Sequence, residues 1–463
     1  MATSTSEETP TKGGSRNLTE GSLTRHLLGM SLPMVIGLFA VIAFNVADTY
    51  FIAQLGTEPL AAISLTFPVV MGFGSLTMGL GVGASSVIAR AFGQGDRQQV
   101  RRLTTHALLL CLVVVAFFLA IGILTIEPLF AVLGAKPKTM PLVKEYMEIW
   151  YIGVLFLVIP MVSNGAIRAI GDARFPAMVM VVAGLVNFLL DPLLIFGMYG
   201  FPKLGIRGAA IATVISRMVT FLASMWVLQY REKLLEWKLP VWNEVWTSWK
   251  GILYVGVPSA GNQIVNPLSI GIITAILSVF GTHTLAAYGV ATRIESISMI
   301  GIFAVSAGIA PIVGQNWGAQ QLDRVTNILR IGFFWCMGYG IVIAIALYFT
   351  APWLVGHFDK HPEVIRISSS YLMLVPISYA GMGIFLVSSS TFNAIGHPLP
   401  STVLTLLRAF VLYVPLAYLG CYLYKEQGVF LAASIANVLV GLAAYIWTRH
   451  TYKALTSADT PAP

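Results

Sequence analysis

The sequence predicts an all-α integral membrane protein with twelve transmembrane helices arranged in two six-helix lobes. The first observation behind this prediction is composition. The chain has 463 residues, of which 57% are hydrophobic and 10% are charged, and its mean hydropathy is +0.79. Soluble domains carry about 25% charged residues. The composition therefore excludes a soluble enzyme, a nucleic-acid-binding module and a disordered chain.

The second observation is a series of apolar stretches, each long enough to cross the roughly 30 Å of hydrocarbon in a bilayer. They span residues 27–55, 60–89, 104–126, 143–167, 176–198, 207–229, 251–280, 284–313, 328–350, 367–394, 400–424 and 427–449. The polar segments outside them are expected to be a disordered tail at 1–26, a linker at 230–250 and a second tail at 450–463. Residues 1–26 lack the apolar core of a cleaved signal peptide.

Charge gives the expected orientation of these helices. Of the 28 Lys and Arg residues, 17 fall in the two tails, in the loops on the same side as the tails or at the helix ends that border them, and 6 fall in the loops on the other side. Cytoplasmic loops collect Lys and Arg. We therefore expect a multi-pass protein of the cell (inner) membrane with both termini, and the 230–250 linker, in the cytoplasm.

The third observation is an internal repeat at an offset of 225 residues. The matching pairs are Pro33 and Pro258, Gly56 and Gly281, Gly93 and Gly318, Tyr146 and Tyr371, and Ala169-Ile170-Gly171 with Ala394-Ile395-Gly396. The repeat divides the chain into an N-lobe at 27–229 and a C-lobe at 251–449. Because six is even, the two lobes share one orientation and are related by a pseudo-twofold axis along the membrane normal. Secondary transporters often have this architecture, with a central cavity between the repeats.

Charged side chains inside a bilayer are costly, so they mark functional sites by default. Asp48 and Asp191 lie on helices that run the same way, and each carboxylate is expected about 10 Å below the outer surface. Asn187 is four residues before Asp191 and so shares its helical face. Thr213, on the following helix, is expected at the same depth.

The second half of the repeat serves as a control for this polar cluster. Where the first half has Asp48, Asn187 and Asp191, the second has Ile273, Phe410 and Val414. Two adjacent carboxylates in a medium of low dielectric suit a site that binds and releases H⁺. With amide and hydroxyl oxygens from Asn187 and Thr213 they also suit Na⁺. The structural alternative is that Asp191 caps a helix break before Pro192 and that Asp48 bonds a neighbour.

Other intramembrane residues are weaker candidates. Pro33 removes a backbone hydrogen bond and permits a kink in the first helix, although its partner Pro258 suggests that such a kink is architectural. Four charged residues lie within or at the start of helices, and we consider them as residues that line the cavity: Arg217, Arg293, Glu295 and Arg408.

Three segments carry a resemblance to a known family. They are Asp48-Thr-Tyr-Phe-Ile-Ala-Gln-Leu-Gly56, the stretch from Asn187 to Gly197, and the stretch from Gly205 to Thr213. Together they resemble the multidrug and toxic compound extrusion (MATE) family of cation-coupled efflux transporters. The resemblance implies a twelve-helix, two-lobed antiporter that needs no cofactor beyond its coupling ion, H⁺ or Na⁺, and exports organic cations and amphiphiles by alternating access.

The resemblance also implies roles for particular residues. In the DinF-like branch, an N-lobe cation site comprises an Asp on the first helix, an Asn and an Asp on the fifth and a Thr on the sixth, which match Asp48, Asn187, Asp191 and Thr213. A tyrosine on the fourth helix joins it, for which Tyr146 and Tyr151 are candidates. Pro33 matches a proline proposed to act as a hinge. The NorM-like branch instead has acidic residues on the seventh and tenth helices, and here those helices have none.

We therefore expect a monomeric transporter that is embedded in lipid and binds cationic or amphiphilic small molecules but no nucleic acid. The alternative is a flippase for a lipid-linked or amphipathic precursor, which would need a more cationic cavity. Arg217, Arg293 and Arg408 keep that alternative open. An integral membrane enzyme would need a catalytic constellation, and the sequence shows no such motif.

Overall fold

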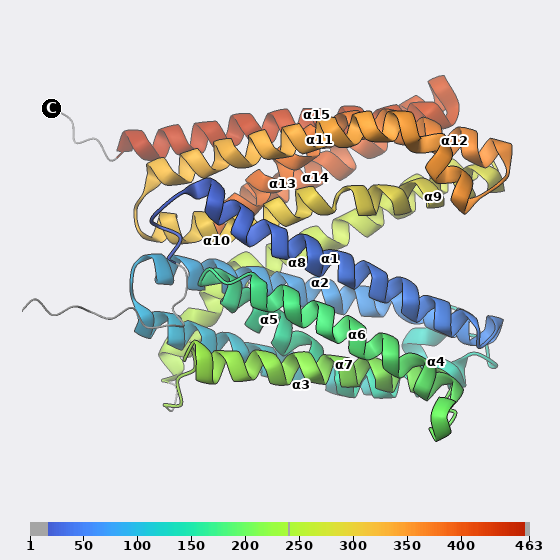
Figure 1. The fold of residues 1–463 in the computed structure, drawn as a ribbon, viewed down its shortest axis with the longest axis horizontal. Coiled ribbons are helices and arrows are strands. Elements are labelled where there is room, and N and C mark those ends of the chain that lie inside the picture. The colour runs from blue at the N-terminus through green and yellow to red at the C-terminus, as the bar shows by residue number, and fades with distance from the viewer. Residues whose placement is uncertain (1–16, 239–240, 459–463) are drawn as a thin grey trace, which may run out of the picture.

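The computed structural model describes residues 17–238 and 241–458, with the backbone alone for 452–458. Two helical lobes lie side by side (Figure 1). The N-lobe consists of α1 (Leu23–Ala53), α2 (Thr57–Gly93), α3 (Arg97–Val132), α4 (Met140–Gly153), α5 (Leu155–Ala169), α6 (Arg174–Phe196), η1 (Met198–Gly200), α7 (Ile206–Trp226) and η2 (Val227–Arg231). The C-lobe consists of α8 (Trp242–Ser278), α9 (Thr282–Ser298), α10 (Ile300–Gly318), α11 (Leu322–Phe358), α12 (Pro362–Leu374), η3 (Val375–Ser378), α13 (Tyr379–Ala394), α14 (Pro398–Leu406), η4 (Leu407–Tyr413) and α15 (Val414–Ala458).

The helices account for twelve crossings within the described residues. Ten helical stretches are long and apolar enough to span a membrane, and α4 and α5, bent by 41° against each other, make an eleventh. The last stretch, Pro398–Thr451, breaks at Tyr424 and Lys425, where the backbone leaves the helical region. It therefore holds two crossings, and the predicted number of helices is confirmed.

The outer surface of the bundle is apolar, as a lipid-facing surface must be. Large hydrophobic side chains project outward from both lobes, including Leu124, which is 81% exposed, and Phe349, which is 75% exposed. Inside, each lobe has its own hydrophobic core. The two cores are interlocked, because the first turns of α1, with Leu27, pack into the C-lobe core, and the first turns of α8, with Ile252, pack into the N-lobe core. Leu27 and Ile252 are equivalent positions of the repeat.

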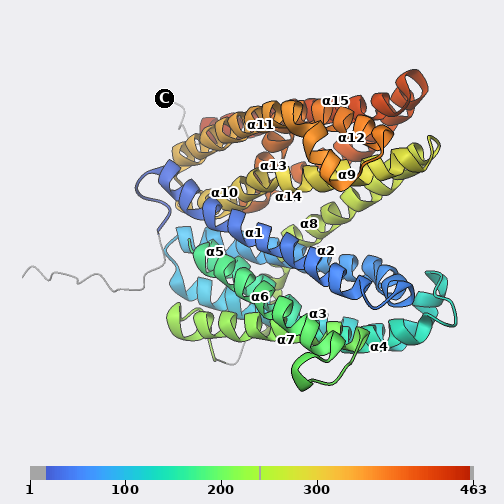
Figure 2. The same ribbon diagram turned by 45° about the vertical axis from the view of Figure 1, so that its right-hand side comes forward.

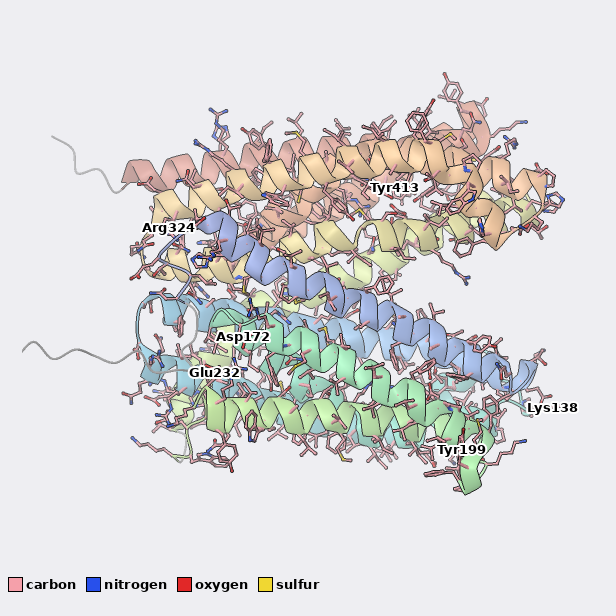
Figure 3. All side chains as sticks on the ribbon, in the orientation of Figure 1. Lys138, Asp172, Tyr199, Glu232, Arg324 and Tyr413 are labelled. Atoms are coloured by element: carbon pink, nitrogen blue, oxygen red, sulfur yellow. The ribbon has the colours of Figure 1, made fainter. Side chains whose placement is uncertain are left out.

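The two lobes make their polar contacts at one end of the bundle. We call this the terminal end, because the first and last described residues both lie there, together with Arg324, Asp172 and Glu232 (Figure 3). Lys138 and Tyr199 lie at the opposite end, which we call the far end. From the side, the lobes diverge toward the far end (Figure 2).

Equivalent positions of the repeat form cross-lobe hydrogen bonds at the terminal end. Arg90 of α2 donates to the carbonyl of Ile395 at 3.4 Å. Its repeat partner, Gln315 of α10, donates to the carbonyl of Ala169 at 2.7 Å. The acceptors belong to the repeated Ala-Ile-Gly segments. The contact therefore has the pseudo-twofold symmetry that the repeat predicts.

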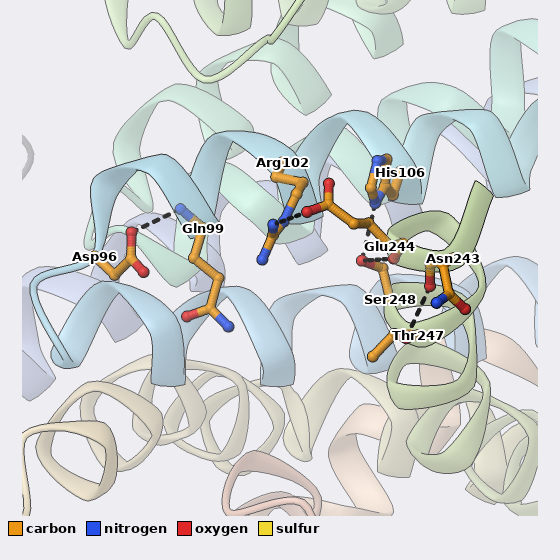
Figure 4. A network of polar contacts seen from close by, with 8 residues as sticks. All are labelled: Asp96, Gln99, Arg102, His106, Asn243, Glu244, Thr247 and Ser248. Carbon is orange, nitrogen blue, oxygen red and sulfur yellow. Dashed lines mark hydrogen bonds and ion pairs between the residues drawn. The ribbon is translucent and has the colours of Figure 1, made fainter. Parts of the chain in front are cut away.

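A second contact at this end joins α3 to α8 (Figure 4). Arg102 pairs with Glu244 at 2.8 Å, and Nδ1 of His106 lies 2.9 Å from the Ser248 hydroxyl. Close by, Arg231 pairs with Asp172 and, through Nε at 2.9 Å, with Glu232. Burial raises the pKa of the Glu232 carboxyl, while the adjacent Arg231 acts in the opposite direction.

The structure corrects three of the predicted boundaries. A disordered tail through residue 26 is wrong for residues 17–26, since Leu18 is 1% exposed and its backbone N–H donates to the Gln315 side chain at 3.0 Å. The remainder of that tail, 1–16, lies outside the described residues. The linker is shorter than 230–250, because α8 begins at Trp242. At the C-terminus, α15 continues to Ala458, beyond residue 450, where the tail is expected to begin. Residues 459–463 lie outside the described residues.

Candidate ion-coupling site

The predicted N-lobe residues come from helices that pack against one another. α1 contributes Asp48 and packs along α6, which contributes Asn187 and Asp191, while α7 contributes Thr213 and contacts both α6 and α4. Asp48 and Asp191 each stand five residues before the far end of their helix. At 1.5 Å per residue, both lie about 8 Å below that end. The two carboxylates thus stand at the same distance from the ends of their helices.

Asn187 connects Asp191 to α7. With its amide oriented so that both groups find partners, the side-chain nitrogen donates to Oδ2 of Asp191 at 2.8 Å and the oxygen accepts from the backbone N–H of Thr213 at 3.3 Å. In the opposite orientation the nitrogen lies 3.5 Å from the Thr213 hydroxyl. Asn187 and Asp191 are both 0% exposed, and Thr213 is 5% exposed. The four-residue spacing thus puts the amide and the carboxylate on one helical face, as predicted.

Two carboxylate oxygens in this group have no hydrogen-bond donor among the described residues: Oδ1 of Asp48 and Oδ1 of Asp191, both buried. Buried polar atoms are nearly always hydrogen-bonded, so two unsatisfied oxygens in one place call for an explanation. The two carboxylates also interact electrostatically with each other. A bound H⁺ or a metal cation would relieve both conditions.

Two further side chains complete what we call the N-lobe cluster. Arg217 of α7 interacts electrostatically with Asp48, and Tyr146 of α4 interacts with Asp48, Asp191 and Arg217. The sequence indicated Arg217 as a cavity residue, whereas in the structure it interacts with Asp48 and Tyr146. The N-lobe cluster is therefore Asp48, Tyr146, Asn187, Asp191, Thr213 and Arg217.

Tyr151 and Pro33 lie outside the N-lobe cluster. Tyr151 is 1% exposed and packs edge-on against Phe73 and Trp150. Of the two candidate tyrosines, the structure brings Tyr146 alone to the carboxylates. Pro33 lies within α1, which continues as one helix from Leu23 to Ala53 on both sides of it.

The remaining candidates belong to the C-lobe. Arg293 is exposed on α9. Glu295, also on α9, accepts a hydrogen bond of 2.6 Å from the Tyr371 hydroxyl of α12. Arg408 of η4 donates through Nε to the Asn437 side chain of α15 at 2.9 Å. We call Glu295, Tyr288, Tyr371, Ser378, Arg408, Tyr413 and Asn437 the C-lobe cluster; Figure 3 marks Tyr413.

Reasoning from the sequence missed several members of the C-lobe cluster. Tyr371 was visible only as the repeat partner of Tyr146, and Asn437 is an amide inside an apolar helix. An intramembrane amide is a usable signal, because such groups pair across helices. Its partner could not be read from spacing, since Arg408 is 29 residues away.

Comparison with known proteins agrees with this fold. A family model described as MatE matches residues 33–193 and 258–419, which begin at the repeat partners Pro33 and Pro258. The chain is 38% identical over 445 residues to the FAD transporter of Shewanella oneidensis, covering 96% of this chain and 98% of that protein.

Two solved structures are also similar. The MATE transporter VcmN of Vibrio cholerae in the bent form is 28% identical, with a TM-score of 0.88 over 93% of this chain and 97% of that one. The outward-facing conformation of a multidrug resistance MATE family transporter is 27% identical, with a TM-score of 0.89 over 97% of this chain and 100% of that one.

The two interlocked six-helix lobes and the apolar outer surface define a multi-pass membrane protein, and the proteins that it resembles are transporters. The family model covers both lobes, and the similarity to the relatives extends over nearly the whole chain. The chain belongs to the MATE family.

Proposed function

We propose that the chain is a secondary active exporter that exchanges its substrate for H⁺, and that the proton binds at the N-lobe cluster. The observation that supports this proposal is the pair of buried, unsatisfied carboxylate oxygens of Asp48 and Asp191. A proton on one carboxylate turns that group into a hydrogen-bond donor and removes the repulsion between the two negative charges. An ion gradient is a sufficient driver, since one charge that crosses 100 mV releases about 2.3 kcal/mol.

H⁺ suits the N-lobe cluster better than Na⁺. The oxygens suited to Na⁺ in the cluster come from Asp48, Asn187, Asp191 and Thr213, but the amide oxygen of Asn187 already accepts from Thr213. The guanidinium of Arg217 interacts with Asp48 and repels a metal cation in a medium of low dielectric. A proton neutralises a carboxylate in place and needs no further ligands.

The excess of Lys and Arg in the tails and in the loops at the terminal end favours a cytoplasmic location for that end, with the protein in the cell membrane. In that orientation the cross-lobe bonds of Arg90 and Gln315 close the cytoplasmic side. The structure then corresponds to the outward-facing state of alternating access, in line with its similarity to an outward-facing relative.

Two substrate classes have support. Organic cations and amphiphiles fit the relatives named for multidrug resistance. FAD, which is anionic, fits the relative with 38% identity and the intramembrane arginines Arg217 and Arg408. Export of a lipid-linked precursor is the remaining alternative, and the same vesicles can be used to test it.

The test is transport in proteoliposomes, with the pH gradient and the sodium gradient imposed separately. We expect a pH gradient alone to drive efflux of a cationic dye or of FAD, and the Asp48→Asn variant to abolish the response. Asp323→Asn, at an exposed position in the first turn of α11, is the matched control. Efflux driven by sodium alone, or full activity of Asp48→Asn, would overturn proton coupling at this site.

A further inference from the structure

The C-lobe cluster holds one carboxylate and one guanidinium within the membrane. Glu295 accepts a hydrogen bond of 2.6 Å from the hydroxyl of Tyr371, which is 3% exposed. Glu295 stands thirteen residues into α9 and Arg408 ten residues after the start of α14. At 1.5 Å per residue, Glu295 is about 20 Å from the far end and Arg408 is about 15 Å from the terminal end. The cluster is therefore near the middle of the bundle, the depth at which secondary transporters bind substrate.

Arg408 is held by one edge only. Its Nε donates to Asn437, and the Asn437 amide donates to the Ser378 hydroxyl at 3.0 Å. Ser378 is 0% exposed and Asn437 is 4% exposed, so the support is rigid. Within the described residues, the two terminal nitrogens of Arg408 make no hydrogen bond or ion pair.

Glu295 and Arg408 influence each other without direct contact. They interact electrostatically, but no ion pair within 4.0 Å joins them in the described part of the chain. The other groups that interact with Arg408 are the hydroxyls of Tyr288, Tyr371 and Tyr413. The guanidinium thus has a distant counter-charge and free donors.

The repeat shows that the lobe does not need this pair in order to fold. The N-lobe position equivalent to Glu295 is Val70, and with the two-residue deletion that aligns the later helices the equivalent of Arg408 is Leu185. The same six-helix scaffold therefore forms with aliphatic residues at both positions. Buried charged groups are also a weak source of stability compared with apolar replacements. A role in binding accounts for the pair better than a role in folding.

We propose that Arg408 binds a phosphate group of the transported molecule, so that the C-lobe cluster selects for a dinucleotide such as FAD. A guanidinium presents two parallel N–H donors that match phosphate oxygens. Glu295, fixed by Tyr371, balances the charge of Arg408 while the site is free. A bound phosphate takes over that balancing role. The inference rests on the proposed export function and deepens it by naming the substrate class.

The test is equilibrium binding of FAD and of riboflavin, which has the same ring but no phosphate, to purified protein in nanodiscs. We expect Arg408→Gln to weaken FAD binding at least tenfold and to change riboflavin binding less than twofold. Arg330→Gln, at an exposed position on α11, is the control. Equal losses for both ligands, or no loss for FAD, would overturn the proposal.

Two variants that keep Arg408 guard against a folding defect. Glu295→Gln removes the competing negative charge and is expected to strengthen FAD binding severalfold. Asn437→Asp gives the guanidinium of Arg408 a permanent anionic partner and is expected to weaken FAD binding. A structural role predicts losses in both variants, so a loss of FAD binding in Glu295→Gln contradicts the proposal. Thermal unfolding of each variant checks that it is folded.

Two further arms separate the sources of phosphate and the two proposals. Nanodiscs with and without phosphatidylglycerol show whether a lipid phosphate competes with FAD; displacement of FAD by the lipid would assign the site to a headgroup and overturn selection for a dinucleotide. If wild-type protein binds no FAD, this inference is also wrong. Proton-driven efflux of a cationic dye still tests the N-lobe site independently.

Discussion

The N-lobe and the C-lobe have one scaffold and two different polar centres. Each centre includes the tyrosine at the same repeat position, Tyr146 or Tyr371. Around Tyr146 stand two carboxylates and one guanidinium, with two carboxylate oxygens unsatisfied. Around Tyr371 stand one carboxylate and one guanidinium, with the carboxylate already accepting a hydrogen bond. Among the described residues, the N-lobe centre has carboxylate oxygens that lack a hydrogen-bond donor, and the C-lobe centre has guanidinium N–H groups that lack an acceptor.

We propose that this difference divides the work of an exchanger between its halves. A centre with net negative charge suits a cation, and a centre with free N–H donors suits an anion. The depths differ too, since Asp48 and Asp191 stand five residues from the far end of their helices and Glu295 thirteen. Duplication supplied two equal lobes, and a few buried substitutions made them unequal.

The largest expected effect comes from removing the N-lobe charge. We expect Asp48→Asn to reduce pH-driven efflux at least tenfold, which corresponds to about 1.4 kcal/mol in the coupled step, while FAD binding in nanodiscs changes little. Measuring pH-driven efflux and FAD binding on the same preparation of Asp48→Asn tests this prediction. If both fell together, the two centres would not be separate.

An intermediate effect is expected at the interlocked terminal end. Gln315→Ala leaves the carbonyl of Ala169 and the N–H of Leu18 without partners, at a cost of about 1–3 kcal/mol for each buried group. Hydrogen–deuterium exchange at residues 17–21 should therefore speed up, and the midpoint of thermal unfolding should fall. Gln98→Ala, at an exposed position in the first turn of α3, is the control. Unchanged exchange would show that this contact does not hold the lobes together.

The smallest effects are expected from the equivalent tyrosines, and they compare the lobes most directly. Tyr371→Phe removes the donor to Glu295 and should alter FAD affinity two- to fivefold, without a change in proton-driven dye efflux. Tyr146→Phe should do the reverse, because its hydroxyl interacts electrostatically with Asp48 and Asp191. An intramolecular hydrogen bond contributes about 1 kcal/mol net, which sets this scale. Identical profiles of the two variants would contradict a division of labour.

The sequence was sufficient to predict the helices, the two lobes and most of the N-lobe cluster. Apolar length and the 225-residue offset are local or periodic properties, and the four-residue spacing of Asn187 and Asp191 fixes a shared face. Packing across helices is neither local nor periodic. For that reason the pairing of Arg408 with Asn437 could not be predicted, and neither could the choice of Tyr146 over Tyr151.

The order at residues 17–26 shows the same limit. This segment is polar and reads as a tail, yet the Asn316 side chain donates to the carbonyl of Leu18 at 3.1 Å and Arg324 donates to the carbonyl of Gly21 at 3.0 Å. Its partners are some 300 residues away in the chain. Local composition carries no information about them.

The pseudo-symmetric crossing at the terminal end also has a practical consequence. A methyl group added at Gly93 would collide with the backbone of Gln315, and one added at its repeat partner Gly318 would collide with the backbone of Arg90. Backbone atoms cannot swing aside as a side chain can. Alanine at either position would therefore wedge the lobes apart at the end where they now meet. The two glycines offer a matched pair of single-atom wedges for trapping the opposite conformation for structure determination.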